Sequence, residues 1–504
     1  MTSQTAACDT LTLPRPLTPE DLERAARPLT VDVDPDARER VVASQKVLAC
    51  RLQAAEPVYG STTGFGPLVV YQGRTNAASQ CDNTLAHLGA GQGADLPLPV
   101  VRATLLVRLA SLARGRSGVS PEVLDALAAA LRTTFTPAVP EWGSVGASGD
   151  LIPLSYVASA LRGTGRAYLG GERLPATEAL TRAGLRPLML DGRDALALVN
   201  GTSLTAAAAG LALARLRRGH QAALALTALL ADLLGCASEF ASAALLEAFG
   251  HPHAAQAGRV LREQLAGSRP TGQRPLQEPY SIRCVPQLAG AAGSALHYTS
   301  EVIGHDLAGI SDNPLFFAEL GDTEDVVHGG NFFGQPVAFA ADLLTLVAVQ
   351  LGNLAERQLD LLVDPHRNGG LPPMLTTDPG RQHGVQGVQL AATAIVAAMR
   401  RSAVPASIQS LPTNLHNQDV VPFGTQAAFN ALNQAESLRL LQGSLALGLR
   451  QAAHVGARRP TALANTAMLE RLEAAIPPID PDRPLDDDVR VAADVLDDFL
   501  TGET

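Results

Sequence analysis

Apolar residues recur at helical spacing over most of the sequence, and this periodicity limits the possible folds more than any other feature. Leu124, Leu127 and Leu131 form one such stripe, and Ser120 and Pro121 precede it as a helix N-cap and a first helical residue. Strand-like alternation is scarce, and aromatic residues, which sheets favour, make up only 4% of the chain. The sequence therefore predicts a mainly α fold.

Two further stretches support a helical organisation. Residues 222–249 are rich in Ala and Leu on nearly all sides, which predicts a helix buried on most of its faces. Asp232 and Glu239 in this stretch argue against a membrane span, so we expect no membrane partner. Residues 484–500 are predicted to form an acidic helix.

Gly and Pro gather in short islands that interrupt the helical pattern. The islands are residues 60–67, 89–93, 143–153, 272–286 and 329–336. Because irregular segments on a rigid scaffold often carry binding and catalytic groups, we expect the chemistry to lie in them.

No repeat of fixed period marks the borders of domains in this chain. We divide it into an N-terminal region over residues 1–205, a central long-helix region over residues 206–310 and a C-terminal helical region over residues 311–504.

Charge and composition exclude several functions. The formal net charge is -10, and Arg and Asp are interspersed, so we expect no nucleic-acid partner. Hydrophobic residues reach 46% against 17% charged residues, which suggests extra surface buried between subunits. Lys46 is the only lysine, which leaves no other residue for a Schiff-base mechanism.

The cysteines point to a reducing compartment. The five are far apart in the sequence and contain no C-x-x-C pair, so we interpret them as free thiols. They are Cys8, Cys50, Cys81, Cys236 and Cys284. The first ten residues lack the features of a signal peptide, and we therefore expect a cytoplasmic protein.

The segment 143–150, with the sequence GSVGASGD, contains closely spaced glycines that allow tight backbone conformations. The amide nitrogen of Gly149 could attack the carbonyl of Ala147, since neither side chain crowds the approach, and the hydroxyl of Ser148 could leave as water. The product would be a conjugated electrophilic ring. For the tripeptide alone, an ordinary glycine turn is the alternative.

The longer string GSVGASGDLIPLSYVASAL, residues 143–161, resembles the signature of the histidine, phenylalanine and tyrosine ammonia-lyase family. Further matching strings cover roughly residues 55–425. They are VYGSTTGFG from Val58, ALVNGTS from Ala197, EPYSIRC from Glu278, DNPLFF from Asp312, HGGNFFGQP from His328, LAERQ from Leu354 and NQDVV from Asn417.

The resemblance implies an ammonia-lyase/fumarase-like architecture, in which a long central helical bundle joins an N-terminal region that carries the reactive ring. It implies a homotetramer whose active sites draw on more than one subunit. It also implies that Ala147, Ser148 and Gly149 form the prosthetic group 4-methylidene-imidazol-5-one, with no metal or nucleotide cofactor.

The resemblance also assigns roles to residues. Tyr59 would remove a proton from the β-carbon of an aromatic amino acid, which needs a site that favours phenolate. Arg283 would bind the substrate carboxylate with its planar guanidinium, and Tyr280 would lie beside it if the segment is helical. Asn200 and Asn417 would hold the prosthetic carbonyl or the substrate.

Three further positions concern the substrate ring. Phe332 would pack near the electrophile. His87 and Leu88 resemble the His-Leu pair of tyrosine-using members, and an imidazole can bond a buried phenol. Gln418 is neutral where histidine-using members carry a glutamate. The sequence is thus closest to the tyrosine ammonia-lyases.

Two departures from the family pattern bear on the pocket. Phe333 stands where many members have histidine or a smaller residue, and Pro422-Phe423 replaces the more usual Ser-Met. We expect both to reshape the substrate pocket.

The expected reaction is conversion of L-tyrosine to trans-4-hydroxycinnamate and ammonia. A tyrosine 2,3-aminomutase would use the same electrophile, and histidine or phenylalanine could be the substrate instead. A non-enzymatic alternative is a helical scaffold that has lost activity, although Tyr59, Ser148 and Arg283 are all present. The His251-Pro-His253 string lacks nearby acidic or cysteine ligands and is interpreted as a loop, not a metal site.

Overall fold

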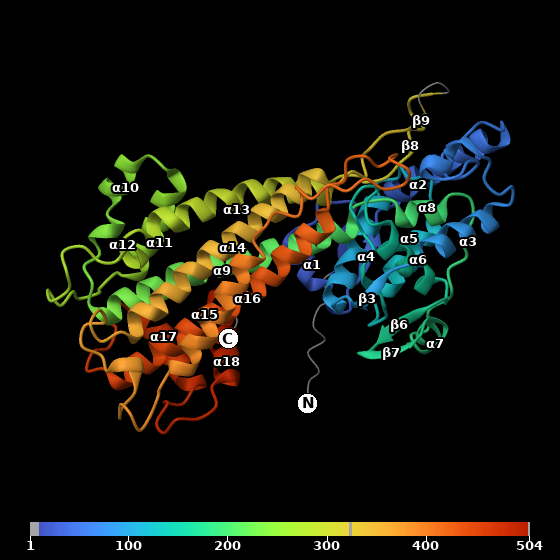
Figure 1. Ribbon diagram of the computed structural model, residues 1–504. Helices are drawn as coiled ribbons and strands as arrows, with labels where there is room; N and C mark the ends of the chain where they lie inside the picture. Colours follow the sequence, from blue (N-terminus) through green and yellow to red (C-terminus); the bar gives the residue numbers. More distant parts are fainter. Residues whose placement is uncertain (1–9, 322–324, 502–504) are drawn as a thin grey trace. The chain divides into compact units, whose positions relative to one another are not determined.

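The computed structural model describes residues 10–321 and 325–501. In these residues 58% of the chain is helical, in eighteen α-helices, and the strands are few and short (Figure 1). The predicted mainly α fold is therefore confirmed. The chain divides into two compact units, which are described separately. Unit 1 comprises Met1–Leu211, Ser300–Asp342 and Pro405–Phe429, and unit 2 comprises Ala212–Thr299, Leu343–Val404 and Asn430–Thr504.

Unit 1 holds the shorter helices and the small sheets. Its complete helices are α1 (Pro19–Arg24), α2 (Pro35–Gln53), α3 (Ala77–Leu88), α4 (Leu98–Leu112), α5 (Pro121–Leu131), α6 (Leu151–Leu161), α7 (Ala176–Arg182), α8 (Asp194–Val199) and the 3-10 helix η1 (Gly66–Val70). Its strands are β1 (Leu11–Leu13), β2 (Val31–Val33), β3 (Gln92–Asp95), β4 (Thr136–Pro137), β5 (Pro140–Trp142), β6 (Arg166–Leu169), β7 (Glu172–Pro175), β8 (Leu315–Phe316) and β9 (Val326–Val327).

The strands of unit 1 pair locally into small sheets. β1 and β2 are parallel, with Thr12 opposite Asp32, whereas β3–β5, β4–β6–β7 and β8–β9 are antiparallel. The core lies around α4, where every residue from Val100 to Leu112 is buried. The buried Arg102 on this helix donates to backbone carbonyls, among them those of Ala25 at 2.6 Å and Leu131 at 2.8 Å. These bonds satisfy carbonyls at helix ends that lack intrahelical partners.

Unit 2 is built from long helices and the helices that cover them. Its complete elements are η2 (Glu239–Ala241), α10 (Ala243–Phe249), α11 (Pro252–Gln264), α12 (Tyr280–Arg283), η3 (Pro373–Leu375), α15 (Gln386–Arg401), α17 (Leu463–Ala475) and α18 (Asp486–Thr501). The division between the units falls within α9 (Ser203–Leu234), α13 (Val285–Ala308), α14 (Gln335–Val363) and α16 (Gly424–Val455).

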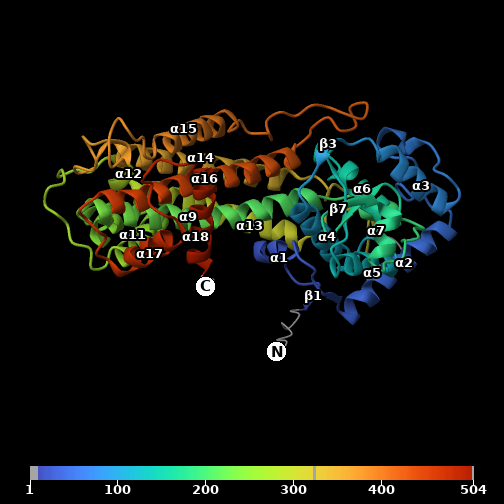
Figure 2. The same cartoon turned by 90° about the horizontal axis from the view of Figure 1, so that it is seen from below.

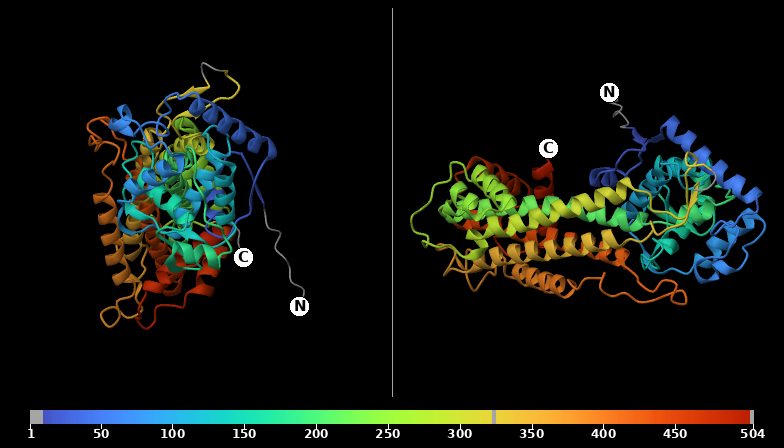
Figure 3. Two further views of the ribbon diagram at one scale, coloured as in Figure 1. Left: turned by 90° about the vertical axis from the view of Figure 1, so that its right-hand side faces the viewer. Right: turned by 90° about the horizontal axis from the view of Figure 1, so that it is seen from above.

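Within unit 2 the long helices run side by side (Figures 1 and 3). Polar side chains tie them together, since Gln358 on α14 donates to Thr227 on α9 at 2.7 Å. Gln442 on α16 donates to the carbonyl of Gly219 on α9 at 2.6 Å. Each of these amides is buried and thereby finds a partner in an apolar environment.

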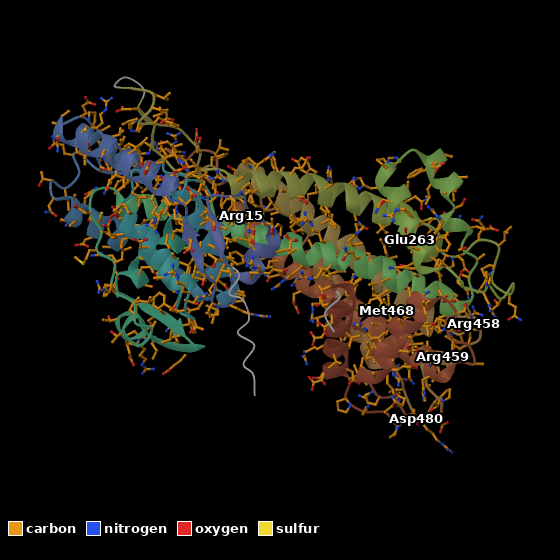
Figure 4. The ribbon with its side chains drawn as sticks, turned by 180° about the vertical axis from the view of Figure 1, so that it is seen from behind. Arg15, Glu263, Arg458, Arg459, Met468 and Asp480 are labelled. Atoms are coloured by element: carbon orange, nitrogen blue, oxygen red, sulfur yellow. The ribbon has the colours of Figure 1, made fainter. Side chains whose placement is uncertain are left out.

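The covering helices of unit 2 are held by similar contacts. α15 lies along α14 (Figure 2), where Arg400 Nε donates to Asn353 Oδ1 at 2.7 Å. Met468, on α17, is 2% exposed, and Arg458 just before that helix donates to the carbonyl of Asp232 at 3.0 Å (Figure 4). These contacts place the C-terminal helices against the long ones.

The structure differs from the expected single helix over residues 222–249. α9 ends at Leu234, because Gly235 takes a left-handed conformation with φ of +71°, which terminates an α-helix. The following residues form η2 and α10, and Leu245 and Phe249 are exposed. The part up to residue 234 is buried as predicted.

The two units also differ from the three consecutive regions expected from the sequence. Each unit is assembled from three separate segments, because the long helices carry the chain from one unit to the other. The predicted acidic helix over 484–500 corresponds to α18, and the predicted helix after Ser120 corresponds to α5.

The cysteines and one apolar helix complete the description. Cys50, Cys81, Cys236 and Cys284 are free thiols, as predicted, whereas Cys8 lies outside the described residues. In the described part of the chain, α14 alone is long and apolar enough to cross a membrane, and 72% of its most apolar window is buried. Such burial is typical of a core helix.

Candidate active site

A cavity of about 1150 Å³ opens in unit 1, in the range of sites for small molecules. It brings together most of the site residues predicted from the sequence. Those that line it are Tyr59, His87, Leu88, Ala147, Ser148, Gly149, Asn200, Phe332, Asn417 and Gln418. Elements distant in sequence, among them α3 and α8, contribute these side chains.

The Ala147-Ser148-Gly149 segment is tightly turned. Gly146 pairs with Gly149 across the turn, and Gly149 has a left-handed φ of +66°. A Cβ on Gly149 would lie 2.2 Å from the backbone of Gly201, so only glycine fits there. Ala147 is 4% exposed and packs in an apolar cluster with Val421. The segment is therefore held by close backbone contacts.

Asp150 anchors this turn. Its carboxylate is fully buried and accepts hydrogen bonds from the amides of Leu204 and Thr205, both at 2.9 Å, at the start of α9. The hydroxyls of Ser144 and Thr425 lie 2.8 and 2.7 Å from Oδ1. A carboxylate is stabilised by the amides and the dipole at a helix N-terminus. Asp150 thus fixes the adjacent turn to α9.

Buried charge lies next to Gly201. An ideal Cβ on Gly201 would meet Arg108 Nη1 at 2.3 Å. Arg193 pairs with Asp312 at 2.8 and 3.0 Å, and Arg108 Nη2 lies 3.7 Å from the same carboxylate. All three side chains are fully buried, and burial lowers the pKa of Arg108 to about 10. Two guanidiniums thus share one carboxylate beside the turn.

Asn200 presents an acceptor to the cavity. Its Nδ2 donates to the carbonyl of Asn313 at 3.1 Å, which determines the orientation of the amide. Its Oδ1 is buried and has no hydrogen-bond partner among the described residues. An unpartnered buried oxygen is unfavourable unless a donor reaches it, so a ligand donor is expected there.

Tyr59 and His87 face the cavity through a shared aromatic neighbour. The Tyr59 hydroxyl accepts a hydrogen bond from the amide of Gly66 at 2.8 Å, and its ring meets Phe65 edge-on. Phe65 stacks on His87 with ring centroids 5.7 Å apart. The Gly66 amide therefore fixes the position of the phenol oxygen.

His87 also has a defined hydrogen-bond arrangement. Its Nδ1 lies 3.1 Å from the carbonyl oxygen of Asn83, one turn earlier on α3. A carbonyl only accepts, so Nδ1 carries a proton, and in the neutral ring Nε2 is then an acceptor. The side chain is exposed to the cavity that it lines.

Gln418 reaches the Ala-Ser-Gly turn directly. Its Nε2 donates to Ser148 Oγ at 2.8 Å, and its Oε1 accepts from the hydroxyl of Thr413. Asn417 lies beside it on the cavity wall. Among the cavity-lining side chains, Gln418 therefore contacts the hydroxyl of Ser148 directly.

Comparison with known proteins places this arrangement in a family. The sequence model of the aromatic amino acid lyase family matches residues 17–474 of this chain. The chain belongs to this family. It is therefore a carbon–nitrogen lyase, as the sequence predicts.

Relatives of the lyase are similar over nearly the whole chain. It is 36% identical to the histidine ammonia-lyase of Symbiobacterium thermophilum, over 95% of this chain and 94% of that one. It is 39% identical to the histidine ammonia-lyase of Anaeromyxobacter sp. strain K, over 92% and 93%. The solved structure of tyrosine aminomutase from Streptomyces globisporus matches with a TM-score of 0.92 and 32% identity, covering 98% of each chain.

Two predicted site residues of the lyase lie elsewhere in the chain. Tyr280 and Arg283 form the short helix α12 of unit 2 and are not among the described residues that line the cavity. The Arg283 guanidinium lies over the Tyr280 ring at 4.7 Å from its centroid, so the two are neighbours as predicted. Tyr280 is 71% exposed.

The departures from the family pattern fall in two places. Phe333 lines the cavity, as expected. Pro422 and Phe423 do not lie on the described cavity wall, and Phe423 packs behind the turn in the same apolar cluster as Ala147. Its amide donates to the carbonyl of Val145 at 3.0 Å. Phe423 therefore supports the turn from behind, and the effect of the pair on the shape of the pocket stays a prediction.

Several residues of the lyase's site were not singled out by sequence reasoning. Asp150 and Gly201 lie within the matching strings, but their contacts join segments of the chain that are distant in the sequence. Phe65 and Thr413 act through neighbouring side chains. The one available signal was Asp150 itself, a carboxylate followed directly by an apolar helix. In the described residues no group of three or more His, Cys, Asp or Glu side chains could hold a metal ion.

The carboxyl group of Asp306, which is bonded to Thr202 just before α9, makes the free energy of unfolding of the lyase depend on pH. Burial raises the pKa of Asp306 to about 6, although Thr202 Oγ1 donates to it at 3.0 Å. The folded protein therefore binds this proton more tightly than the unfolded chain. The stabilisation is present in acid and is lost as the pH rises through about 6.

We expect Asp306→Asn to remove this dependence, because the amide oxygen can still accept from Thr202 and no charge has to be buried. As the pH rises from about 4 to about 6, the variant should gain stability relative to the unsubstituted protein. Urea midpoints of both proteins across this range measure the effect. A difference between the midpoints that does not change with pH contradicts it.

Proposed function

We propose that the enzyme converts L-tyrosine to trans-4-hydroxycinnamate and ammonia, using 4-methylidene-imidazol-5-one formed from Ala147, Ser148 and Gly149. The observation that carries the proposal is that the Ala-Ser-Gly turn and His87 line one cavity. The turn supplies the electrophile and His87 the partner for a phenol.

The residues of the turn fit this prosthetic group. Gly149 has no side chain that could shield its amide nitrogen, and Ser148 lines the cavity. Asp150 and Gly201 would hold the segment, and the unpartnered Oδ1 of Asn200 would accept from a donor in the site. Once formed, the group supplies an electrophile that makes the α-amine a better leaving group.

Tyr59 would act as the base for the β-proton. The hydrogen bond from the Gly66 amide fixes the position of the phenol oxygen that would accept this proton. Asn417, and Phe332 on the opposite loop, would position the substrate in the cavity.

Arg283 would bind the substrate carboxylate from a neighbouring subunit of a homotetramer, with Tyr280 beside it. Arg283 Nη1 donates to Gln277 Oε1, whereas its Nε has no hydrogen-bond partner among the described residues, and Tyr280 is largely exposed. A planar guanidinium suits a carboxylate. We further propose a cytoplasmic location, in keeping with the free thiols.

Tyrosine is proposed as the substrate because the two side chains that would meet its ring, those of His87 and Gln418, can form hydrogen bonds and carry no negative charge. Nε2 of His87 can accept from a phenol hydroxyl, since Nδ1 is occupied by the Asn83 carbonyl. Gln418 offers no negative charge for a basic imidazole. A site that bonds a hydroxyl disfavours the analogue that lacks it.

His87→Phe is expected to invert this preference. The substitution removes the acceptor and keeps an aromatic ring against Phe65, so kcat/KM for L-tyrosine relative to L-phenylalanine should fall by about two orders of magnitude or more. Both substrates are measured on the same variant, and the phenylalanine rate serves as its control. An unchanged ratio would show that His87 does not determine the preference for tyrosine over phenylalanine.

Two other outcomes have specific support. The relatives from Symbiobacterium and Anaeromyxobacter are named histidine ammonia-lyases, which favours histidine as the substrate. The similar structure from Streptomyces is a tyrosine aminomutase, which favours a β-amino acid product.

Incubation with L-tyrosine, L-phenylalanine and L-histidine in separate reactions distinguishes these functions. Absorbance reports the conjugated acid, and chromatography reports β-amino acids. Fast release of 4-hydroxycinnamate supports the proposal, urocanate as the main product replaces tyrosine with histidine, and β-tyrosine identifies a mutase. No product from any of the three overturns the proposed activity.

A further inference from the structure

The hairpin over residues 413–418 holds one side chain against the hydroxyl of Ser148. Gln418 Nε2 donates to Ser148 Oγ at 2.8 Å, while Gln418 Oε1 accepts from the hydroxyl of Thr413. Thr413 Oγ1 and Ser148 Oγ can each donate or accept, and in this structure Thr413 donates to the amide oxygen while the NH2 end faces Ser148. The contact with Thr413 therefore holds the Gln418 side chain against the serine.

The backbone of this hairpin adopts an unfavourable conformation to bring the pair together. Asn414, Leu415 and His416 have left-handed φ values of 50°, 53° and 62°. Three successive non-glycine residues in this region persist only where the surrounding structure determines them. The turn is closed by Thr413 N donating to Gln418 O at 3.0 Å and by Gln418 N donating to Thr413 O at 3.3 Å.

We infer that Thr413 and Gln418 serve the formation of the electrophile, by holding and polarising the Ser148 hydroxyl that leaves as water. The inference rests on the proposed function. It adds a step before any substrate binds, because the contact is made to the Ser148 hydroxyl, which formation of the ring removes.

Formation of the ring requires the loss of two water molecules. First, the Gly149 nitrogen bonds to the Ala147 carbonyl carbon, and the carbonyl oxygen leaves as water with the amide protons of Gly149 and Ser148. Second, the Ser148 Cα–H and Cβ–Oγ bonds break, and the proton and the hydroxyl leave as water, which creates the methylidene group. No oxidant or reductant is needed.

Gln418 acts in the second loss. As the Cβ–Oγ bond breaks, negative charge develops on Oγ, and an N–H donor already placed at 2.8 Å stabilises that charge. If the amide were reversed, its oxygen would face Oγ and would oppose the charge. Gln418 is thus a positioning and polarising residue for maturation, and Thr413 holds it in place.

The test follows the maturation of the full-length chain by mass spectrometry during cell-free synthesis. Each loss lowers the mass by one water, so the rate is read without any substrate. We expect Gln418→Leu to slow the second loss at least tenfold, and Thr413→Val to slow it less. Thr413→Ser keeps the hydroxyl and should mature as fast as the unsubstituted chain.

Gln409→Leu is the matched control, because Gln409 is exposed in the same segment and its side chain contacts only the carbonyl of Pro405, at 3.3 Å. It should mature at the normal rate. If Gln418→Leu does the same, the inference is overturned and the proposed function stands. If the unsubstituted chain never loses two waters, the proposed function itself fails.

A folding defect is separated from a maturation defect by circular dichroism of each variant. If Gln418→Leu loses its helical signal, the rates of the second water loss in Thr413→Val and Thr413→Ser test the inference instead. Slowing with valine and not with serine supports the inference, and equal rates overturn it.

Discussion

Replacing Ser148 with alanine is expected to lower kcat for the amino acid substrate by a factor on the order of 10³ or more. Alanine has no hydroxyl to leave, so the ring cannot gain its methylidene carbon, and the amine has no electrophile to add to. The fold should persist, because the side chain faces the cavity and its one side-chain hydrogen bond among the described residues is with Gln418.

Intact mass checks the cause of this loss. The unsubstituted protein should be lighter than its sequence by two water molecules, and Ser148→Ala by one at most. Ser159→Ala, on α6 and away from the described cavity wall, is the control and should keep both mass loss and activity. A Ser148→Ala enzyme within tenfold of the normal kcat would exclude this prosthetic group.

Tyr59→Phe is expected to lower kcat by about 10²- to 10⁴-fold, the usual contribution of a general base. The substitution keeps the ring that packs edge-on against Phe65 and removes only the hydroxyl that accepts from Gly66. Substrate binding and the loss of two waters should therefore remain. The measurement is kcat and KM together with intact mass.

Tyr168→Phe provides the matched control for this change. This substitution also removes a hydrogen bond, the one from the Tyr168 hydroxyl to Asp95 at 2.8 Å. Tyr168, however, lies on β6 outside the described cavity wall. Its activity should be normal. Equal activities of Tyr59→Phe and Tyr168→Phe would show that Tyr59 is not the base. If Tyr59→Phe fails to lose two water molecules, Tyr59 acts in forming the prosthetic group instead.

The helical class and the Ala-Ser-Gly segment could be predicted because both depend on local pattern. Apolar spacing identifies a helix such as α5 without knowledge of its neighbours. Motif strings likewise identified Tyr59, Ser148 and Gln418, which the fold then brings to one cavity.

Other features could not be predicted because they are set by contacts between distant segments. The buried carboxylate of Asp150 meets the start of α9 more than fifty residues later. The end of α9 depends on the left-handed Gly235, which composition does not reveal. The place of Phe423, behind Ala147 and not on the cavity wall, depends on how the chain returns to unit 1 after residue 404.

By itself the sequence determined the helical class and the family, and it pointed to the Ala147-Ser148-Gly149 segment, because each depends on local spacing and side-chain chemistry. The tertiary structure alone decided which end of the Gln418 amide faces Ser148, which nitrogen of His87 is free to accept, and why no side chain fits at Gly149. These properties depend on the direction of hydrogen bonds and on the space between backbones. Direction and space arise only when segments far apart in the chain are packed together.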